Sequence, residues 1–229
     1  MVTARPIRRL GKPATDGPYN HYLHRPVSAR VSPLVAPRMS ANAATGWGLL
    51  AGLAAAAAAA AGWPIVAAVV ITAFSVLSCV DGEVARLRGQ TSRLGDFLDT
   101  MVDRIVECAF VLALAVDLRR TYPHWGPAAG LVLLAAVLLL VVSSEKFRSA
   151  FGRGYPKRQA DGLFCWLTSG SDARFTLLSL GLVIEGVTGR AVVLLAAVLV
   201  VAGVSVLNLL WRLVAVVRLA GREAPGEAP

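Results

Sequence analysis

Long apolar stretches recur along the chain and constrain its fold more than any other feature. Six such stretches follow one another, at about residues 45–63, 64–79, 95–118, 127–144, 173–185 and 191–213. A helix of about 20 apolar residues crosses the hydrocarbon core of a bilayer. Because 56% of the residues are hydrophobic and only 16% are charged, the sequence predicts an all-α integral membrane protein with six transmembrane helices.

The pattern divides the chain into four predicted regions. Residues 1–18 form a flexible basic tail that lacks the apolar core of a cleavable signal peptide. Residues 19–42 mix aromatic, apolar and basic side chains, which predicts an N-terminal juxtamembrane amphipathic helix, limited by Pro26 and Pro33. Residues 43–219 form the six-helix domain, and residues 220–229 have the composition of a disordered tail.

Lys and Arg gather on one face of this predicted bundle, in the N-terminal segment, the C-terminal end and the connections at 83–95 and 145–172. The other face has turns at 62–64, 118–127 and 186–190, where Arg119, Arg120 and Arg190 are the exceptions. Because basic loops stay in the cytoplasm, we expect a multi-pass protein of the cell's inner (plasma) membrane with both termini cytoplasmic. This topology and anionic partners, not nucleic acid, explain the formal net charge of +9.

Three carboxylates lie inside or beside segments that otherwise suit a bilayer. Asp81 ends the second apolar stretch, and Asp99 and Asp103, four residues apart, lie on one face of the third. Each such charge costs about 2.5 to 3.5 kcal/mol at the centre of a membrane helix, so a compensating group is expected. Oxygen ligands suit Mg²⁺, Mn²⁺ or Ca²⁺ rather than zinc, and a hard divalent cation indicates a phosphate substrate. We therefore predict that the three acids converge at the cytoplasmic end of a helix pair.

The stretch SCVDGEVARLRGQTSRLGDFLDTMVD, residues 78–103, resembles the signature D-x2-D-G-x2-A-R-x8-G-x3-D-x3-D of the CDP-alcohol phosphotransferases. Seven of the eight fixed positions match, namely Asp81, Gly82, Ala85, Arg86, Gly95, Asp99 and Asp103. The first aspartate of the pattern is Ser78, whose hydroxyl can ligate Mg²⁺, and Asp96 is another candidate substitute. Residues 40–45, SANAAT, resemble the S/T-P-N-x-x-T motif at the start of the family's first span, with Ala41 in place of proline.

This resemblance implies an enzyme that transfers a substituted phosphate from CDP-diacylglycerol or CDP-inositol to an acceptor hydroxyl, releasing CMP, in phospholipid or phosphodiester biosynthesis. It implies two divalent ions, Mg²⁺ or alternatively Mn²⁺, held by Asp81, Asp99, Asp103 and Ser78. Asp103 is also the implied general base, and its burial is expected to raise its pKa. The implied nucleotide-binding residues are Asp81, Gly82, Ala85, Arg86, Gly95 and Asp99.

Basic residues near the fifth apolar stretch are candidates for a second anion site. Arg174, with Lys146, Arg148 and Arg158, could hold the phosphate of an acceptor such as inositol phosphate or glycerol phosphate. The tendency of basic residues to flank cytoplasmic helix ends also explains them. Residues 82–104 most resemble the branch that contains di-inositol phosphate phosphate synthases and phosphatidylinositol phosphate synthases. Glu107 either orients Asp103 or pairs with Arg104.

Two functions of different class remain open. The first is an active metal-dependent phosphotransferase acting on a CDP-alcohol donor and an alcohol or sugar-phosphate acceptor. The second is a catalytically silent relative in which Ser78 has weakened the metal site, so that the chain acts as a membrane binding or assembly partner. We expect a homodimer, formed through the alanine run at 54–61 or the late spans. A small transporter is disfavoured because the sequence has no inverted repeat.

Overall fold

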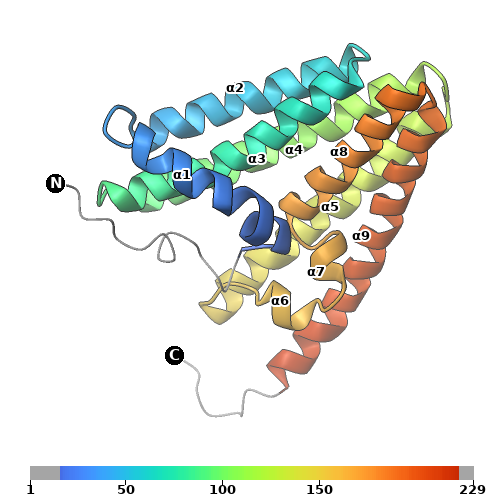
Figure 1. The fold of residues 1–229 in the computed structure, drawn as a ribbon. Coiled ribbons are helices and arrows are strands. Elements are labelled where there is room, and N and C mark those ends of the chain that lie inside the picture. Colours follow the sequence, from blue (N-terminus) through green and yellow to red (C-terminus); the bar gives the residue numbers. More distant parts are fainter. Residues whose placement is uncertain (1–15, 222–229) are drawn as a thin grey trace.

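Six long helices form the body of the protein in the computed structural model, which describes residues 16–221 (Figure 1). They are α2 (Ala41–Ala60), α3 (Pro64–Leu87), α4 (Arg93–Arg119), α5 (Trp125–Phe151), α8 (Ser171–Thr188) and α9 (Ala191–Ala220). Shorter helices precede and connect them: η2 (Asn20–His24), α1 (Arg25–Val35), α6 (Lys157–Ala160) and α7 (Phe164–Leu167). The predictions for residues 1–15 and 222–229 lie outside the described residues.

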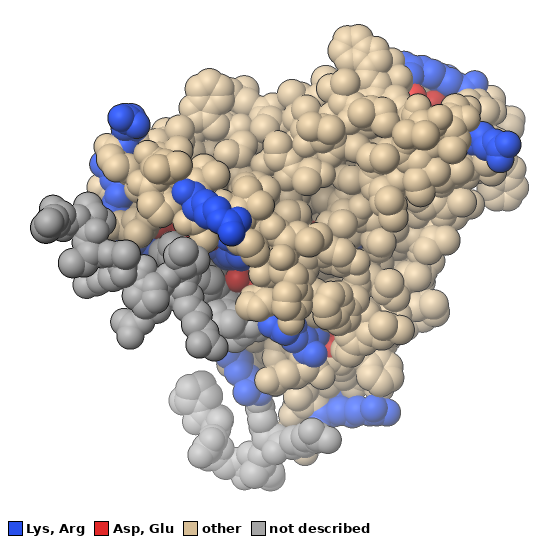
Figure 2. Space-filling view, in the orientation of Figure 1, with Lys and Arg blue, Asp and Glu red and all other residues tan. Residues whose placement is uncertain are grey.

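Each long helix lies where the apolar pattern predicted one, and four of them are identified as candidate membrane spans within residues 16–221. By length and composition, α2, α3, α5 and α9 can cross a bilayer. The helices α4 and α8 carry several charged side chains, so composition alone does not identify them as spans. On the face drawn in Figure 2, Lys and Arg gather at two opposite ends, and a broad band of other residues separates them.

The hydrophobic core lies where the long helices meet. Phe175 of α8 makes edge-to-face contacts with Phe74 of α3 and Phe110 of α4, with ring centroids 5.7 and 5.9 Å apart. Small residues let α2 approach α4, because a Cβ added at Gly52 would lie 2.3 Å from the Val106 side chain. Several alanines of the run at 54–61 are also buried, namely Ala55, Ala56, Ala58 and Ala59. The run therefore packs within this chain's own core.

Two connections are shorter than the sequence predicted, because the helices continue beyond their apolar stretches. The predicted 83–95 loop is reduced to a few residues: α3 ends at Leu87, and α4 begins at Arg93. The Ser92 side chain caps α4 by accepting a hydrogen bond from the Gly95 backbone N–H at 3.0 Å. Helix α5 continues to Phe151, so Glu145, Lys146 and Arg148 lie on a helix and not in the predicted loop.

The juxtamembrane segment is helical from Asn20 to Val35, but its amphipathic character is the reverse of that of a helix on a water-soluble protein. Pro26 lies in the first turn of α1, where proline is tolerated, whereas Pro33 lies inside the helix and does not limit it as predicted. The serines of α1, Ser28 and Ser32, are fully buried. The apolar side chains of Leu23, Val27 and Leu34 are 52%, 46% and 70% exposed. The polar face of this segment thus packs on the protein.

Candidate functional site

A pocket beside the connection between α3 and α4 brings together all six predicted nucleotide-binding residues. We call it the motif pocket. Its lining consists of Ala41, Asn42, Thr45, Asp81, Gly82, Ala85, Arg86, Gln90, Thr91, Ser92, Gly95, Asp96 and Asp99. The residues come from the start of α2, the end of α3 and the start of α4, so most of the signature and the SANAAT motif line one pocket.

The geometry of the motif pocket explains several of its residue types. Asp81 is buried, and its carboxylate accepts hydrogen bonds from the Thr45 hydroxyl at 2.9 Å and the Gly82 backbone N–H at 2.6 Å. A Cβ added at Gly82 would lie 3.3 Å from the nearest nitrogen of the Arg86 guanidinium, so a side chain there would crowd Arg86. Ser40 caps α2 by accepting a hydrogen bond from the Ala43 backbone N–H at 3.2 Å, which fixes the turn that presents Thr45.

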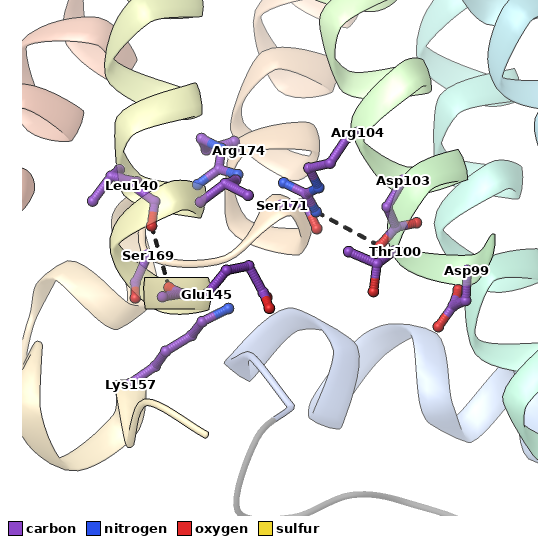
Figure 3. A pocket seen from close by; sticks show the side chains of 12 residues that line it. Asp99, Thr100, Asp103, Arg104, Leu140, Glu145, Lys157, Ser169, Ser171 and Arg174 are labelled. Atoms are coloured by element: carbon purple, nitrogen blue, oxygen red, sulfur yellow. Dashed lines mark hydrogen bonds and ion pairs between the residues drawn. The ribbon is translucent and has the colours of Figure 1, made fainter. Parts of the chain in front are cut away.

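A second pocket lies on the other side of Asp99 and contains the predicted base. We call it the basic pocket. Its lining consists of Asp99, Thr100, Asp103, Arg104, Leu140, Val141, Ser144, Glu145, Lys157, Ser169, Ser171 and Arg174. Figure 3 shows Asp99 and Asp103 on one side of this pocket and Lys157 on the opposite side. Because Asp99 also lines the motif pocket, the two pockets meet at this residue.

Asp103 and Ser78 are in direct contact. The Ser78 hydroxyl on α3 donates a hydrogen bond to the Asp103 carboxylate on α4 at 3.0 Å. The Arg104 guanidinium lies 3.7 Å from the other oxygen of Asp103. Ser78 therefore lies at the site, although its side chain was predicted to be a metal ligand and here interacts with the predicted base.

The predicted metal ligands fit a hard divalent cation in their chemistry but do not converge as predicted. Asp81, Asp99, Asp103 and Ser78 offer only oxygen atoms, as Mg²⁺ and Mn²⁺ require. Among residues 16–221, however, no three His, Cys, Asp or Glu side chains lie close enough together to hold a metal ion. The structure instead pairs Asp81 with Thr45 and Asp103 with Ser78.

Arg174 lies in the basic pocket and belongs to a buried ion-pair network. Its Nε and Nη2 atoms donate to the Glu107 carboxylate at 2.7 and 2.5 Å, and its Nη1 atom donates to the Thr168 backbone carbonyl at 2.5 Å. Arg104 also forms an ion pair with Glu107. Of the two alternatives for Glu107, the structure therefore contains the pairing with Arg104, to which it adds Arg174.

The other predicted acceptor-binding residues do not line the basic pocket. Lys146, Arg148 and Arg158 have exposed side chains. Arg148 forms ion pairs with Asp96 at 3.5 Å and with Glu145 at 4.0 Å. The Asp96 side chain is 54% exposed, and Asp96 also lines the motif pocket. Lys146 and Arg148 lie on the last turns of α5 and Arg158 lies on α6, outside the pocket lining, so their role in acceptor binding stays a prediction.

Lys157 is a residue of the basic pocket that sequence reasoning missed. It begins the short helix α6 and reaches the pocket from the connection between α5 and α8. Burial lowers the pKa of its ammonium group, and the nearby charges of Arg212, Arg104 and Arg174 lower it further, against the opposite effect of Asp172. Such an environment favours an anion beside Lys157, because an anion would offset the crowded positive charge.

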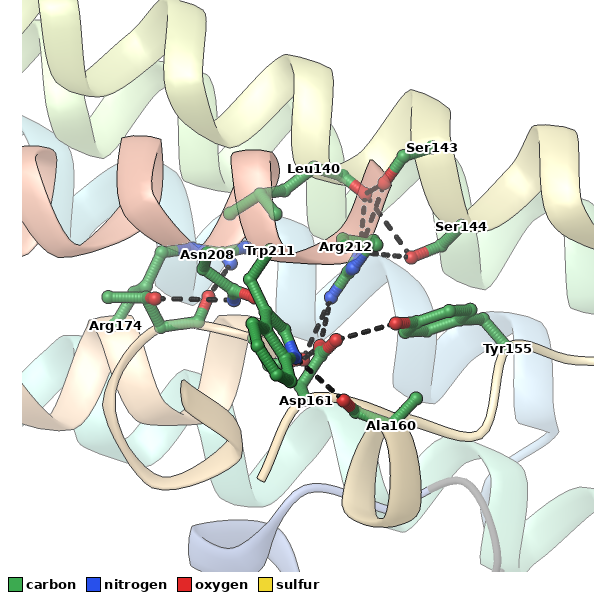
Figure 4. Close-up of polar contacts among 12 residues, drawn as sticks. Leu140, Ser143, Ser144, Tyr155, Ala160, Asp161, Arg174, Asn208, Trp211 and Arg212 are labelled. Carbon is green, nitrogen blue, oxygen red and sulfur yellow. Dashed lines mark hydrogen bonds and ion pairs between the residues drawn. The ribbon is translucent and has the colours of Figure 1, made fainter. Parts of the chain in front are cut away.

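A buried arginine holds this connection in place (Figure 4). Arg212 of α9 is fully buried and donates to the Asp161 carboxylate at 2.5 Å and to the Ser169 hydroxyl at 2.9 Å. It also donates to the Leu140 carbonyl of α5 at 2.9 Å, and the Tyr155 hydroxyl donates to Asp161 at 2.7 Å. The network thereby fixes both sides of α6, and with them Lys157. A charge in an apolar helix was the signal that could have identified Arg212.

Known proteins resemble this chain in sequence. Residues 38–201 match the CDP-alcohol phosphatidyltransferase family. A bifunctional IPC transferase and DIPP synthase from Thermococcus kodakarensis is 35% identical over 147 residues, which are 64% of this chain and 33% of that protein. The protein of the same description from Aquifex aeolicus is 32% identical over 147 residues, 63% of this chain and 33% of that protein. The chain thus spans about one third of the length of these curated relatives.

Solved structures share the fold. The phosphatidylinositol phosphate synthase PgsA1 of Mycobacterium tuberculosis with CDP-DAG bound matches with a TM-score of 0.68 and 22% identity, over 89% of this chain and 96% of that chain. The same enzyme in complex with manganese and citrate matches with a TM-score of 0.65 and 21% identity, over 88% of this chain and 90% of that chain. The chain therefore has an all-helical, multi-pass membrane fold of this kind.

Proposed function

Because the chain belongs to the CDP-alcohol phosphatidyltransferase family, we propose that it transfers a substituted phosphate from a CDP-alcohol to the hydroxyl of an acceptor that carries its own phosphate, releasing CMP. The observation that carries this proposal is the meeting of two pockets at Asp99. One pocket has the nucleotide-binding signature, and the other has a carboxylate, Asp103, opposite a lysine. Donor and acceptor could thus occupy separate pockets and react between them.

We assign the donor to the motif pocket. Its diphosphate would lie beside Gly82 and Arg86, where the backbone is accessible and a guanidinium is near, and Asn42, Gln90 and Thr91 offer polar groups to the rest of the nucleotide. CDP-diacylglycerol is the first donor to test, because the mycobacterial structure was obtained with CDP-DAG. CDP-inositol is the second.

A divalent ion, Mg²⁺ or Mn²⁺, is part of this proposal. Asp81 and Asp99 would hold it, with the Ser78 and Thr45 hydroxyls as further oxygen donors, while Asp103 acts as the base. We propose that Ser78 replaces the first aspartate of the family signature. When bound, the ion would neutralise charge on the diphosphate. The mycobacterial enzyme was crystallised with manganese, which makes Mn²⁺ a practical probe.

In the reaction, the acceptor hydroxyl oxygen forms a bond to the phosphorus that bears the donor's alcohol group, and the bond from that phosphorus to CMP breaks. Asp103 would take the proton from the acceptor hydroxyl. The Ser78 hydroxyl donates to one carboxylate oxygen of Asp103 and Arg104 lies near the other, so the carboxylate is held in one orientation.

The acceptor would place its phosphate in the basic pocket. Lys157 is the direct partner we propose, while the guanidinium of Arg174 is engaged with Glu107 and adds positive potential. We infer an inositol phosphate as the acceptor, because relatives are described as a DIPP synthase and a phosphatidylinositol phosphate synthase. Glycerol phosphate is the alternative acceptor.

We further propose that all six long helices span the membrane and that both pockets face the cytoplasm. Helix α4 packs on α2 and α5, and α8 packs on α3 and α9, so each lies among helices that can cross a bilayer. The start of α2, the end of α3 and the start of α4, which line the motif pocket, lie at the end of the bundle that carries α1 (Figure 1), and Lys157 of the basic pocket begins α6. At the other end, Arg120 forms an ion pair with Asp117 at 2.8 Å, which reduces the net basic charge there.

The experiment that tests the function measures CMP release by purified protein in lipid nanodiscs. CDP-diacylglycerol or CDP-inositol is supplied with inositol phosphate or glycerol phosphate and Mg²⁺. We expect CMP only when donor, acceptor and Mg²⁺ are all present. A donor that binds in a Mg²⁺-dependent manner but never yields CMP with any acceptor would favour the catalytically silent alternative.

Replacing Lys157 tests the acceptor site. We expect Lys157→Met to raise the KM for the phosphate-bearing acceptor about tenfold or more, because a charged hydrogen bond is lost. In the unmodified protein, this KM should rise as the pH passes through the lowered pKa of Lys157, below the range of an ordinary lysine, since the neutral amine no longer attracts phosphate. In Lys157→Arg, which stays protonated, the rise should be absent. The same pH profile in both proteins would exclude Lys157 as the partner.

Replacing Ser78 tests the metal site. Ser78→Asp adds a carboxylate where the family signature has one, so we expect Mn²⁺ to bind about tenfold more tightly, as measured by electron paramagnetic resonance. Ser78→Ala is the matched variant and should weaken binding. If Ser78→Asp leaves the affinity unchanged or lowers it, then Ser78 is not at the metal site.

A further inference from the structure

The segment formed by residues 16–35, which we call the N-terminal strap, is fixed at one end to α3. Its anchor is Glu83, which is fully buried. The carboxylate of Glu83 accepts hydrogen bonds from Arg25 at 2.9 Å, Ser28 at 2.8 Å and Ser32 at 2.6 Å. Arg25 also forms an ion pair with Asp16 at 2.9 Å. Three polar side chains of the strap thus bind one buried carboxylate.

The other end of the strap is fixed to α7 and α8. The Asn20 backbone N–H donates to the Asp172 carboxylate at 3.0 Å. A Cβ added at Gly17 would lie 2.2 Å from that carboxylate, so a larger residue would force the two apart. The Tyr22 ring stacks on Trp166 of α7, with centroids 5.8 Å apart and an interplanar angle of 9°.

These two attachments adjoin the two pockets. Glu83 directly follows Gly82 of the motif pocket. Asp172 directly follows Ser171 of the basic pocket, and the α7 helix that carries Trp166 leads into Ser169 of the same pocket. The strap therefore connects the element behind one pocket to the elements behind the other.

We propose that the N-terminal strap sets the position of the basic pocket relative to the motif pocket, and that Glu83, Trp166 and Asp172 are positioning residues. The effect of the strap on the acceptor KM rests on the proposed function, because it requires the phosphotransferase reaction. Its physical basis is the buried carboxylate, because moving the strap would leave Glu83 without its partners in a place that water does not reach. A strap held at Glu83 can therefore fix the position of α7 and α8 relative to α3.

Two substitutions at opposite ends of the strap test this proposal. Trp166→Ala and Glu83→Gln should each raise the KM for the acceptor about tenfold, through misplacement of the basic pocket, and should leave the affinity for CDP-diacylglycerol within about twofold. The double variant should be no worse than the more affected single variant, because both changes break one connection. Trp166→Phe keeps an aromatic ring on Tyr22 and should restore the acceptor KM.

Trp125→Ala is the matched control, since Trp125 is 70% exposed and lies at the other end of the bundle, at the start of α5. Its KM for the acceptor should not change. If Glu83→Gln changes only donor affinity, or if the two effects add independently in the double variant, then the strap does not connect the pockets.

A spectroscopic measurement tests the strap even if no transfer activity is found. Spin labels can be attached at Leu34→Cys and Leu163→Cys, which replace residues that are 70% and 73% exposed. Cys108→Ala removes the partly exposed native thiol, while Cys79 and Cys165 are buried. The distance distribution between the labels should broaden in Trp166→Ala and in Glu83→Gln. An unchanged distribution in both variants would overturn the proposal, whereas absent activity with the expected broadening would overturn only the proposed function.

Discussion

Asp103→Asn is expected to lower the rate of CMP release by about 10³-fold or more and to leave the affinity for the CDP-alcohol within about twofold. Asp103 lines the basic pocket and not the motif pocket, so its loss should not disturb the donor. An asparagine keeps the size of the side chain and can still accept the hydrogen bond from Ser78. It cannot accept a proton from the acceptor, which is the step assigned to Asp103.

Single-turnover CMP release and equilibrium binding of CDP-diacylglycerol separate these two effects. Asp117→Asn is the matched control, because Asp117 lies on the same helix, α4, at its opposite end, paired with Arg120. This control should retain wild-type turnover. If Asp103→Asn loses donor binding together with turnover, then Asp103 acts as a metal ligand and not as the base.

Asp99→Asn is expected to weaken donor binding more than about 100-fold and to abolish turnover at practical donor concentrations. Asp99 is the residue at which both pockets meet, so it would contact the metal, the diphosphate and the incoming acceptor. The amide is a poorer ligand for a hard divalent ion than the carboxylate.

Isothermal titration of CDP-diacylglycerol with and without Mg²⁺ measures this effect. In the unmodified protein, Mg²⁺ should strengthen binding strongly; in Asp99→Asn, the two titrations should become alike. Asp117→Asn again serves as the control. A donor affinity that still depends on Mg²⁺ in Asp99→Asn would place the ion on other groups.

The sequence predicts the parts of this protein that depend on local pattern. The long helices follow from runs of apolar residues, and the residues of the motif pocket follow from the fixed spacing of the signature. Helix ends were predicted less well, because α3, α4 and α5 extend beyond their apolar residues. Ser92 caps the start of α4, and Gly152 ends α5. Neither end could be located from hydropathy alone.

The residues that hold the site together could not be predicted, since their partners lie far away in the sequence. Arg212 reaches Asp161, 51 positions earlier, and Glu83 accepts a hydrogen bond from Ser28, 55 positions earlier. Lys157 was one of several basic residues in a polar connection, and only the anchoring of that connection by Arg212 distinguishes it from Arg158. The convergence of three acids was predicted from their positions on neighbouring apolar stretches, yet among residues 16–221 no three such side chains lie close enough together to hold a metal ion.

The shared position of Asp99 has a kinetic consequence. Two substrates in separate pockets that meet at Asp99 can be bound at the same time. The phosphate can then pass directly from donor to acceptor, with no covalent intermediate on a protein side chain. A ternary complex should therefore form before any product leaves, and initial-rate plots at several fixed acceptor concentrations should intersect rather than run parallel.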